Sequence, residues 1–449
     1  MPAEGAAAQW RGATTGTETD VMRQSVIGTS LAVAAALGLS ACGGGETESA
    51  GSKTVRVTLA NHVWTENIKK ALPDFEKETG LKVELTQLGE DQLSDQYNVK
   101  LNAGTSELDV MMYRPLQEGK QFAKNNYLAD LTEKVKSNQE WDWSDFQPGP
   151  VQATTYEDKV VGVPLITEQE VLYYRKDLLQ KAGYTNPPKT LDELKEMAAK
   201  IQSQNPGVAG FIARTGKSPA VTQFSSFLYS FGGDFVDESG KASINTDEAK
   251  KAYAFYGGLI KDHGPANVST DMGWPEAMAI FTQGKAAFYT EANSLYKNAT
   301  DPSKSKVSET VGFAPFPEGP AGSKPYSIPS WALGVNEASE NQDNAWKFIE
   351  WATSKAQTLE NQKAGVPGGR TSVASDPAAT ATYPKDLVEA NNVQAKNGIG
   401  HDRPLVVKVA EAREIVGQPI VDAITGKDAA ASADSANEAF QKFLDDEAK

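Results

Sequence analysis

The stretch from Gly162 to Leu179, GVPLITEQEVLYYRKDLL, most constrains how this chain can fold. An apolar, β-branched run stops at the polar residues 167–170 and resumes as VLYY before a charged turn. Two short strands broken by a polar elbow are typical of a chain that crosses between two lobes, and an ordinary pair of strands joined by a turn is the alternative. We predict a hinge here, which forms one wall of a ligand cleft and projects carboxylates and tyrosines from it.

Strand and helix patterns alternate along the chain from Val55 onward. Apolar residues at helical spacing follow the first strand, and we expect Pro73 to kink or break that helix and Gly80 to end it. The alternation predicts an α/β sheet whose ligands gather at the carboxyl ends of its strands. Further strands are predicted over 81–85, 108–113, 286–289 and 330–335, and further helices over 91–103, from the capping box at Asn245, over 274–284 and over 341–353.

The composition excludes several classes of partner. A formal net charge of -15 argues against nucleic acid or an anionic membrane surface, because both require a basic face. One cysteine cannot form a disulfide within the chain, and the three histidines lie far apart without the spacing of a metal site. The sequence has neither a P-loop nor a GxGxxG fingerprint, so we expect neither a metal nor a cofactor.

The amino-terminal region carries a targeting signal. Val26 to Leu39 contains no charge and is too short to span a bilayer comfortably. It runs into Leu-Ser-Ala-Cys, ending at Cys42, which resembles the bacterial lipoprotein signal. The resemblance implies that Cys42 is lipidated and becomes the first mature residue. We predict a start at Met22, a signal peptide over 22–41 and a flexible tether over 42–53.

A series of motifs follows the lipoprotein signal in a recognisable order. They are PDFEKETG, YYRKDLLQKAG, PPKTLDEL, FTQGKAAFY, SWALGV, NAWKFIEWATSK and GVPGGRTS. Together they resemble the family 1 extracellular solute-binding proteins of ABC importers, the maltose-binding-protein-like group, and are most similar to members that bind polyols and small sugars. The similarity extends over nearly all of residues 54–444.

This resemblance implies a two-lobe α/β clamshell that closes on its solute. Lobe 1 would comprise residues 54–166 and 334–384, and lobe 2 would comprise residues 167–333 and 385–449. The protein would be a monomer anchored to the outer face of the cell membrane by its lipid. It would capture a carbohydrate or polyol and deliver it to the membrane subunits of an ABC importer.

A sugar site needs aromatic rings against C–H faces and charged or amide groups around the hydroxyl rim. The family keeps such side chains where Trp274, Glu291 and Trp331 stand, and Arg370 matches the arginine of its GxRT-like turn. Tyr289 and Trp331 are alternatively core residues, and Arg370 an ordinary ion-pair partner. The full set of candidate ligand-binding residues is Glu168, Trp274, Tyr289, Glu291, Trp331 and Arg370, with Asn61, Trp64 and Tyr113 added from lobe 1.

Two other functions are open. A glycoside hydrolase could use Glu168 with Glu291, or Asp271 with Glu291, as its carboxylate pair. A clamshell sugar sensor without transport is the other alternative. For a binding protein without catalytic activity, we expect carboxylates of ordinary low pKa and an affinity that is flat between about pH 6 and 8.

Overall fold

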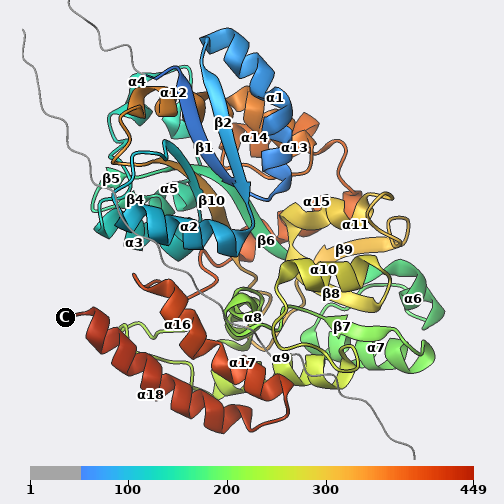
Figure 1. The fold of residues 1–449 in the computed structure, drawn as a ribbon. Helices are drawn as coiled ribbons and strands as arrows, with labels where there is room; N and C mark the ends of the chain where they lie inside the picture. The colour runs from blue at the N-terminus through green and yellow to red at the C-terminus, as the bar shows by residue number, and fades with distance from the viewer. Residues whose placement is uncertain (1–51) are drawn as a thin grey trace, which may run out of the picture. The chain divides into compact units, whose positions relative to one another are not determined.

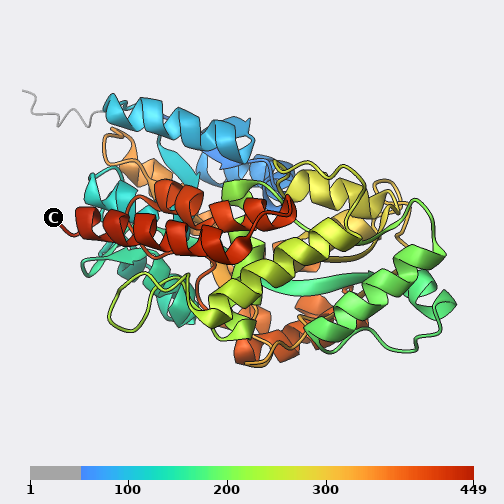
Figure 2. The ribbon, with the colours of Figure 1, turned by 90° about the horizontal axis from the view of Figure 1, so that it is seen from below.

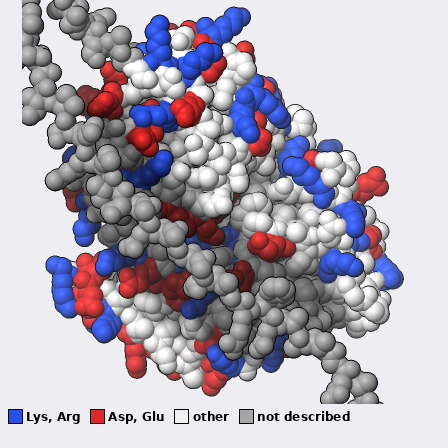
Figure 3. All heavy atoms as spheres, viewed as in Figure 1, with Lys and Arg blue, Asp and Glu red and all other residues white. Residues whose placement is uncertain are grey.

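The computed structural model describes residues 52–449. The predicted signal peptide, Cys42 and all but the last two residues of the predicted tether lie outside these described residues. Within residues 52–449, no helix combines the length and the apolar character needed to cross a membrane. On the part of the surface that the grey atoms leave visible in Figure 3, basic and acidic side chains are interspersed.

One mixed sheet connects the described elements (Figure 1). Its strand order is β2-β1-β3-β10-β6-β8-β7, with β9 paired to β6. Strand β1 runs parallel to β2 and β3, β7 runs parallel to β8, and β10 runs antiparallel to both of its neighbours. The strands are β1 (Thr54–Ala60), β2 (Lys82–Leu88), β3 (Val110–Tyr113), β6 (Val163–Arg175), β7 (Ala209–Ile212), β8 (Ala286–Ala292), β9 (Val311–Pro315) and β10 (Ser327–Val335), and a separate small hairpin contains β4 (Thr155–Tyr156) and β5 (Lys159–Val160).

Strand β6 is the crossing element, and it is a single strand of 13 residues. Its first part pairs with β10, up to the partners Gln169 and Ser327. Its second part pairs with β8 and β9, starting from the partners Glu170 and Ala292. The prediction of two short strands broken by an elbow is therefore wrong. Strand β6 continues through the polar residues because β8 and β9 replace β10 as its pairing partners there.

The buried hydrophobic side chains form separate cores on the two sides of this crossing. One cluster gathers β1, β3, the start of β6 and the end of β10, and we call the elements around it lobe 1. Two further clusters gather the end of β6, β7, β8 and β9, and we call the elements around them lobe 2. Strands β6 and β10 thus connect two independently packed bodies.

The first helix, α1 (Val63–Thr79), shows where local sequence rules fail. Pro73 lies inside it without ending it, so the predicted break is wrong. Ile68 and Phe75 bury on either side of the proline and hold both parts of the helix against the lobe 1 core. Gly80 ends the helix as predicted, in a left-handed conformation with φ of 69°.

Most of the other predicted helices are present. Thr246, rather than Asn245, caps the helix after the Asn245 capping box, and its side chain accepts a hydrogen bond from the Ala249 amide at 3.2 Å. Before β6 the structure has α2 (Glu90–Asn102), η1 (Pro115–Gly119), α3 (Lys120–Lys124), α4 (Lys134–Ser137), η2 (Trp143–Asp145) and α5 (Pro148–Ala153). Between β6 and β10 it has α6 (Lys176–Lys181), α7 (Leu191–Gln204), α8 (Lys217–Phe231), α9 (Asp247–His263), α10 (Trp274–Thr282), η3 (Asn293–Leu295) and α11 (Tyr296–Thr300).

The carboxyl-terminal part is helical, as predicted. After β10 come α12 (Gln342–Ala352), α13 (Lys355–Lys363), α14 (Thr371–Ala374), η4 (Pro377–Thr380), α15 (Lys385–Asn397), α16 (Val409–Val416), α17 (Gln418–Ile424) and α18 (Ala429–Glu447). Helices α17 and α18 pack on α9, so the end of the chain covers lobe 2 (Figure 2).

Candidate functional site

Strand β6 presents two different faces at the crossing. Because successive side chains of a strand point to opposite faces, Glu168 and Glu170 share one face, and Thr167 and Gln169 share the other. We call the face of the two glutamates the front face and the opposite one the rear face. The polar run that interrupts the apolar pattern therefore places carboxylates in front, and a hydroxyl and an amide behind.

Close to the crossing, Glu291 of β8 is the centre of a buried hydrogen-bond network. Arg214 contacts it in bidentate fashion, with Nε 3.0 Å from Oε2 and Nη2 2.6 Å from Oε1. The Tyr289 hydroxyl donates to Oε2 at 2.8 Å, and the Gln223 amide donates to the same oxygen at 3.3 Å. Charge-assisted bidentate pairs are among the strongest hydrogen bonds in proteins, so this carboxylate is held rigidly.

Glu168 lies next to this network without a cation of its own. Its Oε1 accepts a hydrogen bond from the Ser294 hydroxyl at 2.5 Å. Burial raises the pKa of Glu168 to about 7, and the negative charge of Glu291 acts in the same direction. The expectation of an ordinary low pKa is therefore wrong for this residue, because the sequence does not show how deeply the carboxyl is desolvated.

Glu170, two residues along the strand, is fully buried behind Glu168. It is hydrogen-bonded to the Ser226 hydroxyl, which also accepts from the Tyr326 amide at 3.0 Å. Burial raises the pKa of Glu170 well above the ordinary glutamate value, because desolvation disfavours the charged form. Among these three glutamates, only Glu291 is directly paired with the arginine.

Lobe 1 contributes a second charged group to the front face. Glu90 begins α2, where the helix dipole favours a carboxylate, and Arg114 lies 3.2 Å from its Oε2. Burial opposes ionisation of Glu90, but Arg114 and Arg214 outweigh it and lower the pKa of this carboxyl. Arg114 also contacts Glu118 at 2.5 Å and lies over the ring of Trp331, 5.8 Å from its centroid.

The two lobes are in direct contact across the front. The Trp274 indole nitrogen of lobe 2 donates to Glu90 Oε1 of lobe 1 at 3.1 Å. At a second place, Gln117 Oε1 accepts from Nη1 of Arg403 at 2.6 Å and from Nη1 of Arg413 at 2.9 Å. These contacts join segments roughly 180 to 300 residues apart, so the structure corresponds to a clamshell with its lobes together.

The structure brings several of the predicted site residues into one group. Glu168, Tyr289 and Glu291 share the network around Arg214, and Trp274 reaches it from the start of α10 through Glu90. Trp331 is buried beneath Arg114. We use the name front cluster for Glu90, Arg114, Glu168, Arg214, Trp274 and Glu291.

Arg370 is placed elsewhere, within lobe 1, and is fully buried. Its Nε donates to the Thr353 carbonyl at 2.7 Å, and its Nη2 donates to the Trp141 carbonyl at 2.8 Å. Its Nη1 lies 3.1 Å from Asp145, and the guanidinium lies over the ring of Phe146 at 4.2 Å. These bonds tie the 141–145 loop to the end of α12 and take up the donors that a ligand would need.

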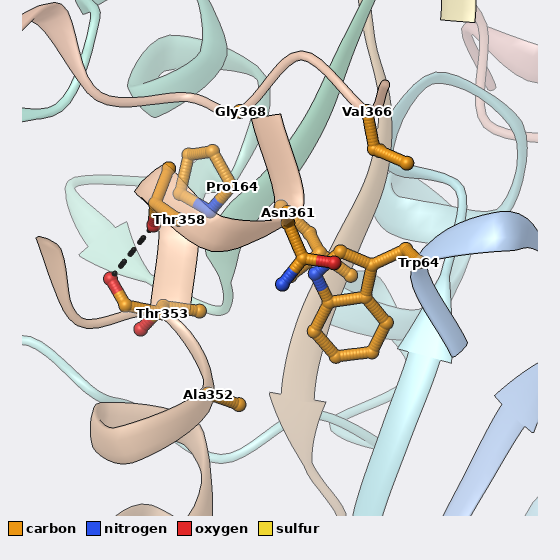
Figure 4. A pocket seen from close by; sticks show the side chains of 9 residues that line it. Trp64, Pro164, Ala352, Thr353, Thr358, Asn361, Val366 and Gly368 are labelled. Carbon is orange, nitrogen blue, oxygen red and sulfur yellow. Dashed lines mark hydrogen bonds between the residues drawn. The ribbon is translucent and has the colours of Figure 1, made fainter. Parts of the chain in front are cut away.

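Tyr113 and Trp64 lie in the lobe 1 core. The Tyr113 hydroxyl donates to the Val161 carbonyl at 3.4 Å, and its ring fills space that only a glycine at 162 leaves open, since a Cβ there would lie 2.2 Å from the hydroxyl. Trp64 lines a cavity of about 10 Å³ between α1 and α13, together with Asn361 and Thr358 (Figure 4).

Asn61 is exposed at the carboxyl end of β1. Its backbone amide donates to the Leu88 carbonyl at 2.7 Å, which places Asn61 next to the start of α2 and thus near Glu90. Its neighbour His62 is half-buried, and desolvation lowers the pKa of that imidazole to about 4, so His62 is neutral. Asn61 is therefore available to a ligand beside the front cluster.

Sequence reasoning missed Glu90, Arg114 and Arg214. Arg114 directly follows β3, Arg214 lies just beyond β7, and Glu90 opens the helix after β2. The rule that ligands gather at the carboxyl ends of parallel strands could have found all three. The predicted ligand set includes the asparagine and the tyrosine at these strand ends but leaves out the charged residues beside them.

Among the described residues, no group of three or more histidine, cysteine, aspartate or glutamate side chains is arranged to hold a metal ion.

The chain is similar in sequence to a known family of proteins. Residues 61–359 match the model of a family described as bacterial extracellular solute-binding protein. A probable ABC transporter-binding protein of Deinococcus radiodurans is 32% identical over 292 residues, which cover 64% of this chain and 68% of the relative.

Two solved structures share both fold and sequence with the chain. A maltose-bound MalE3 of T. maritima is 31% identical with a TM-score of 0.78, covering 87% of this chain and all of its own. An ABC transporter solute-binding protein of Agrobacterium radiobacter in complex with ribitol is 27% identical with the same TM-score, covering 88% of this chain and 99% of its own.

Proposed function

Since the chain belongs to the family of bacterial extracellular solute-binding proteins, we propose that it captures a carbohydrate or polyol outside the cytoplasm and delivers it to an ABC importer. The observation that carries this proposal is the similarity over nearly nine-tenths of the chain to proteins that hold maltose and ribitol. The chemistry of the front cluster supports it, because carboxylates, guanidinium groups and an indole ring are what a hydroxyl rim and a C–H face require.

Several residues of the front cluster have a proposed part in binding. Trp274 offers its ring face to the sugar, and closure of the lobes brings it to Glu90. Glu168 accepts hydroxyl hydrogen bonds, while Glu291 acts through Arg214, which donates to hydroxyl oxygens from the position in which Glu291 holds it. Asn61 adds an amide at the lobe 1 edge. Arg370, Trp64, Tyr113 and Trp331 support the walls by packing instead of touching the solute.

The lobe boundaries predicted from the sequence form part of this proposal. Residues 54–166 and 334–384 would move as one body, and residues 167–333 and 385–449 as the other, about the crossings β6 and β10. The separate hydrophobic cores on either side of the crossings support such a division. The cleft is complete within one chain, so we propose a monomer.

A catalytic role has less support. In the front cluster, both oxygens of Glu291 are occupied by Arg214, and Oε2 also accepts from Tyr289. A carboxylate held in this way is poorly placed to act as a nucleophile or base, and Asp271, the other proposed partner, is exposed. We therefore expect an oligosaccharide incubated with the protein for a day to be recovered unchanged by mass spectrometry.

A thermal-shift screen of sugars and alditols with the purified protein tests the proposed function. A solute that binds only the folded state stabilises it by RT ln(1 + [L]/Kd), about 2.7 kcal/mol at a hundredfold excess over Kd. The expected result is stabilisation by a neutral sugar or alditol that Trp274→Ala weakens. Stabilisation by amino acids or peptides alone would contradict the substrate class.

Lipid anchoring through Cys42 is a further part of the proposal, supported by the uncharged segment that precedes the only cysteine. We expect Cys42→Ala to remain unprocessed or to leave the membrane fraction. Detergent partitioning and mature mass, measured for both proteins in a bacterial host that processes lipoproteins, provide the readout. An unchanged mature mass together with unchanged partitioning would overturn the anchor.

A further inference from the structure

A cavity of about 750 Å³ lies on the rear face of the crossing strands. Thr167 and Gln169 of β6 line it together with their ladder partners in β10, Pro329 and Ser327. Residues of α5, α14 and η4 line it from the lobe 1 side, and residues of α15 line it from lobe 2. Its volume falls within the range of about 300 to 1,000 Å³ that is usual for small-molecule sites.

The lining of this rear cavity is polar but almost free of charge. Its polar side chains are amides and hydroxyls, with no lysine or arginine among the described residues that line it. Asp376 is the one carboxylate in the lining, and its Oδ1 already accepts from the Ala378 amide at 2.8 Å. The rear cavity thus contrasts with the front cluster, where arginines and glutamates face one another.

Buried polar atoms in this lining have no partner within the described part of the chain. They are Gln362 Oε1 and the Tyr383 hydroxyl, whose residues are only 5% and 7% exposed, and Gln169 Oε1 on the crossing strand itself. A buried polar group without a hydrogen bond costs about 1 to 3 kcal/mol, so such groups are rare unless something outside the chain satisfies them. Three of them around one cavity indicate a place built to receive hydrogen-bonding groups.

We propose that the rear cavity is a second binding site, separate from the front cluster, for a small uncharged polyhydroxylated molecule. A hydroxyl group both donates and accepts, so it can satisfy the two glutamine oxygens and the tyrosine hydroxyl alike. An anion would find no cation among the lining residues, and a cation would find only a carboxylate that caps η4.

A molecule bound in the rear cavity affects the relative positions of the two lobes. Its walls come from both lobes and its floor from both crossings, so a molecule bound there holds the lobes in the relative positions that form the cavity. These are the positions in which Trp274 meets Glu90 in front. A rear ligand therefore strengthens binding of a solute at the front, and by linkage a front solute strengthens binding at the rear by the same factor.

The test counts bound molecules by native mass spectrometry during titration with ribitol, D-mannitol and maltose in turn. Four variants accompany the wild type. Glu291→Gln impairs the front cluster, the double variant Gln362→Leu and Tyr383→Phe removes two unpartnered rear atoms, and Ala395→Trp fills the rear cavity from an exposed position of α15. Lys396→Trp is the matched control, because it places the same ring on the same helix outside the lining.

With at least one probe, we expect two molecules per wild-type chain, the weaker of which persists in Glu291→Gln. The double rear variant should bind this molecule roughly tenfold more weakly, since about 1.4 kcal/mol of hydrogen bonding corresponds to a factor of ten. Ala395→Trp should lose it and Lys396→Trp should keep it. A single binding event with all three probes, or a second event that persists in Ala395→Trp, would overturn the rear site. A wild-type protein that shows the weaker event without the tight one would instead count against the proposed function at the front.

Discussion

The front cluster and the rear cavity lie at the same crossing, yet they differ in how their buried polar groups are satisfied. In the front cluster, Glu291 is surrounded by donors from three neighbouring side chains, and its charge is matched by Arg214. Behind, Gln169, Gln362 and Tyr383 each keep an unmatched atom beside open space. The front therefore has a fixed geometry before any ligand arrives, whereas the rear is completed only by something that enters it.

Removing the arginine of the front network should have the largest effect. Arg214→Met leaves the buried carboxylate of Glu291 without its counter-charge, and breaking a buried pair from one side typically costs about 3 to 5 kcal/mol of unfolding free energy. Urea unfolding of the variant and the wild type measures this loss.

The double variant Arg214→Met with Glu291→Leu is the control for this comparison. It removes both charges, so it should be clearly more stable than Arg214→Met alone. Equal stability of the single and double variants would mean that the pair does not organise the front face.

The raised pKa of Glu168 provides a second test of the difference between the two faces of β6. Because burial raises the pKa of this carboxyl to about 7 in the folded state, the folded protein binds more protons than the unfolded chain between about pH 4.5 and 7. Stability from this group is complete below about pH 4.5 and is lost as pH rises through 7, by on the order of 1 to 3 kcal/mol.

Comparison with Glu168→Gln isolates this effect from the other titrating groups. The amide cannot ionise, so the variant should gain stability relative to the wild type as pH increases from 5 to 8. Thr167→Val, on the rear face of the same strand, should show no such pH dependence. A constant stability difference between Glu168→Gln and the wild type would contradict the raised pKa.

Variants of two tryptophans distinguish a side chain that binds the solute from one that packs in the core. Trp274 is partly exposed and its indole nitrogen donates to Glu90 of the other lobe, so Trp274→Ala should weaken solute binding by about 1 to 3 kcal/mol with little change in the melting temperature of the free protein. Calorimetric titration and thermal melts give the two numbers. Trp331 is the matched control, since its burial predicts that Trp331→Ala lowers the melting temperature instead.

The smallest effects are expected at the rear. Tyr383→Phe removes a hydroxyl that has no partner among the described residues, so the unfolding free energy should change by less than about 0.5 kcal/mol. Tyr289→Phe removes a hydroxyl bonded to Glu291 at 2.8 Å and should cost about 1 to 2 kcal/mol. Urea unfolding measures both variants. Equal losses of unfolding free energy would contradict the difference between the front cluster and the rear cavity.

The sequence was sufficient for the fold but not for the whole site. Periodicity located β1, α2, α10 and α12 nearly to the residue, because each helix buries one regular face and β1 starts with an alternating pattern. Pro73 and the polar run in β6 were misjudged, since packing on α1 and ladder partners on β8 overrode the local signals.

Among the site residues, Glu168 was predicted because it interrupts an apolar pattern, whereas Trp274 and Glu291 were predicted from the family resemblance. Arg370 has the same sequence signal as a ligand-binding arginine, yet its guanidinium is enclosed by carbonyls from a loop more than 220 residues away along the chain. Such long-range closure leaves no mark in local sequence. The rear cavity was equally invisible, because it is defined by segments that meet only in the folded chain.

The alternation of side chains along β6 has a consequence for how this family can change over time. Deleting or inserting one residue near Thr167 would exchange the two faces, turning the carboxylates toward the neutral cavity and the amide toward Arg214. Insertions or deletions at this crossing should therefore be tolerated only when they change the strand by two residues at a time. Substitutions can instead alter the side chains on one face without affecting the other. The length of β6 therefore determines which of its faces carries the charged side chains, and the identities of its residues determine what each face can bind.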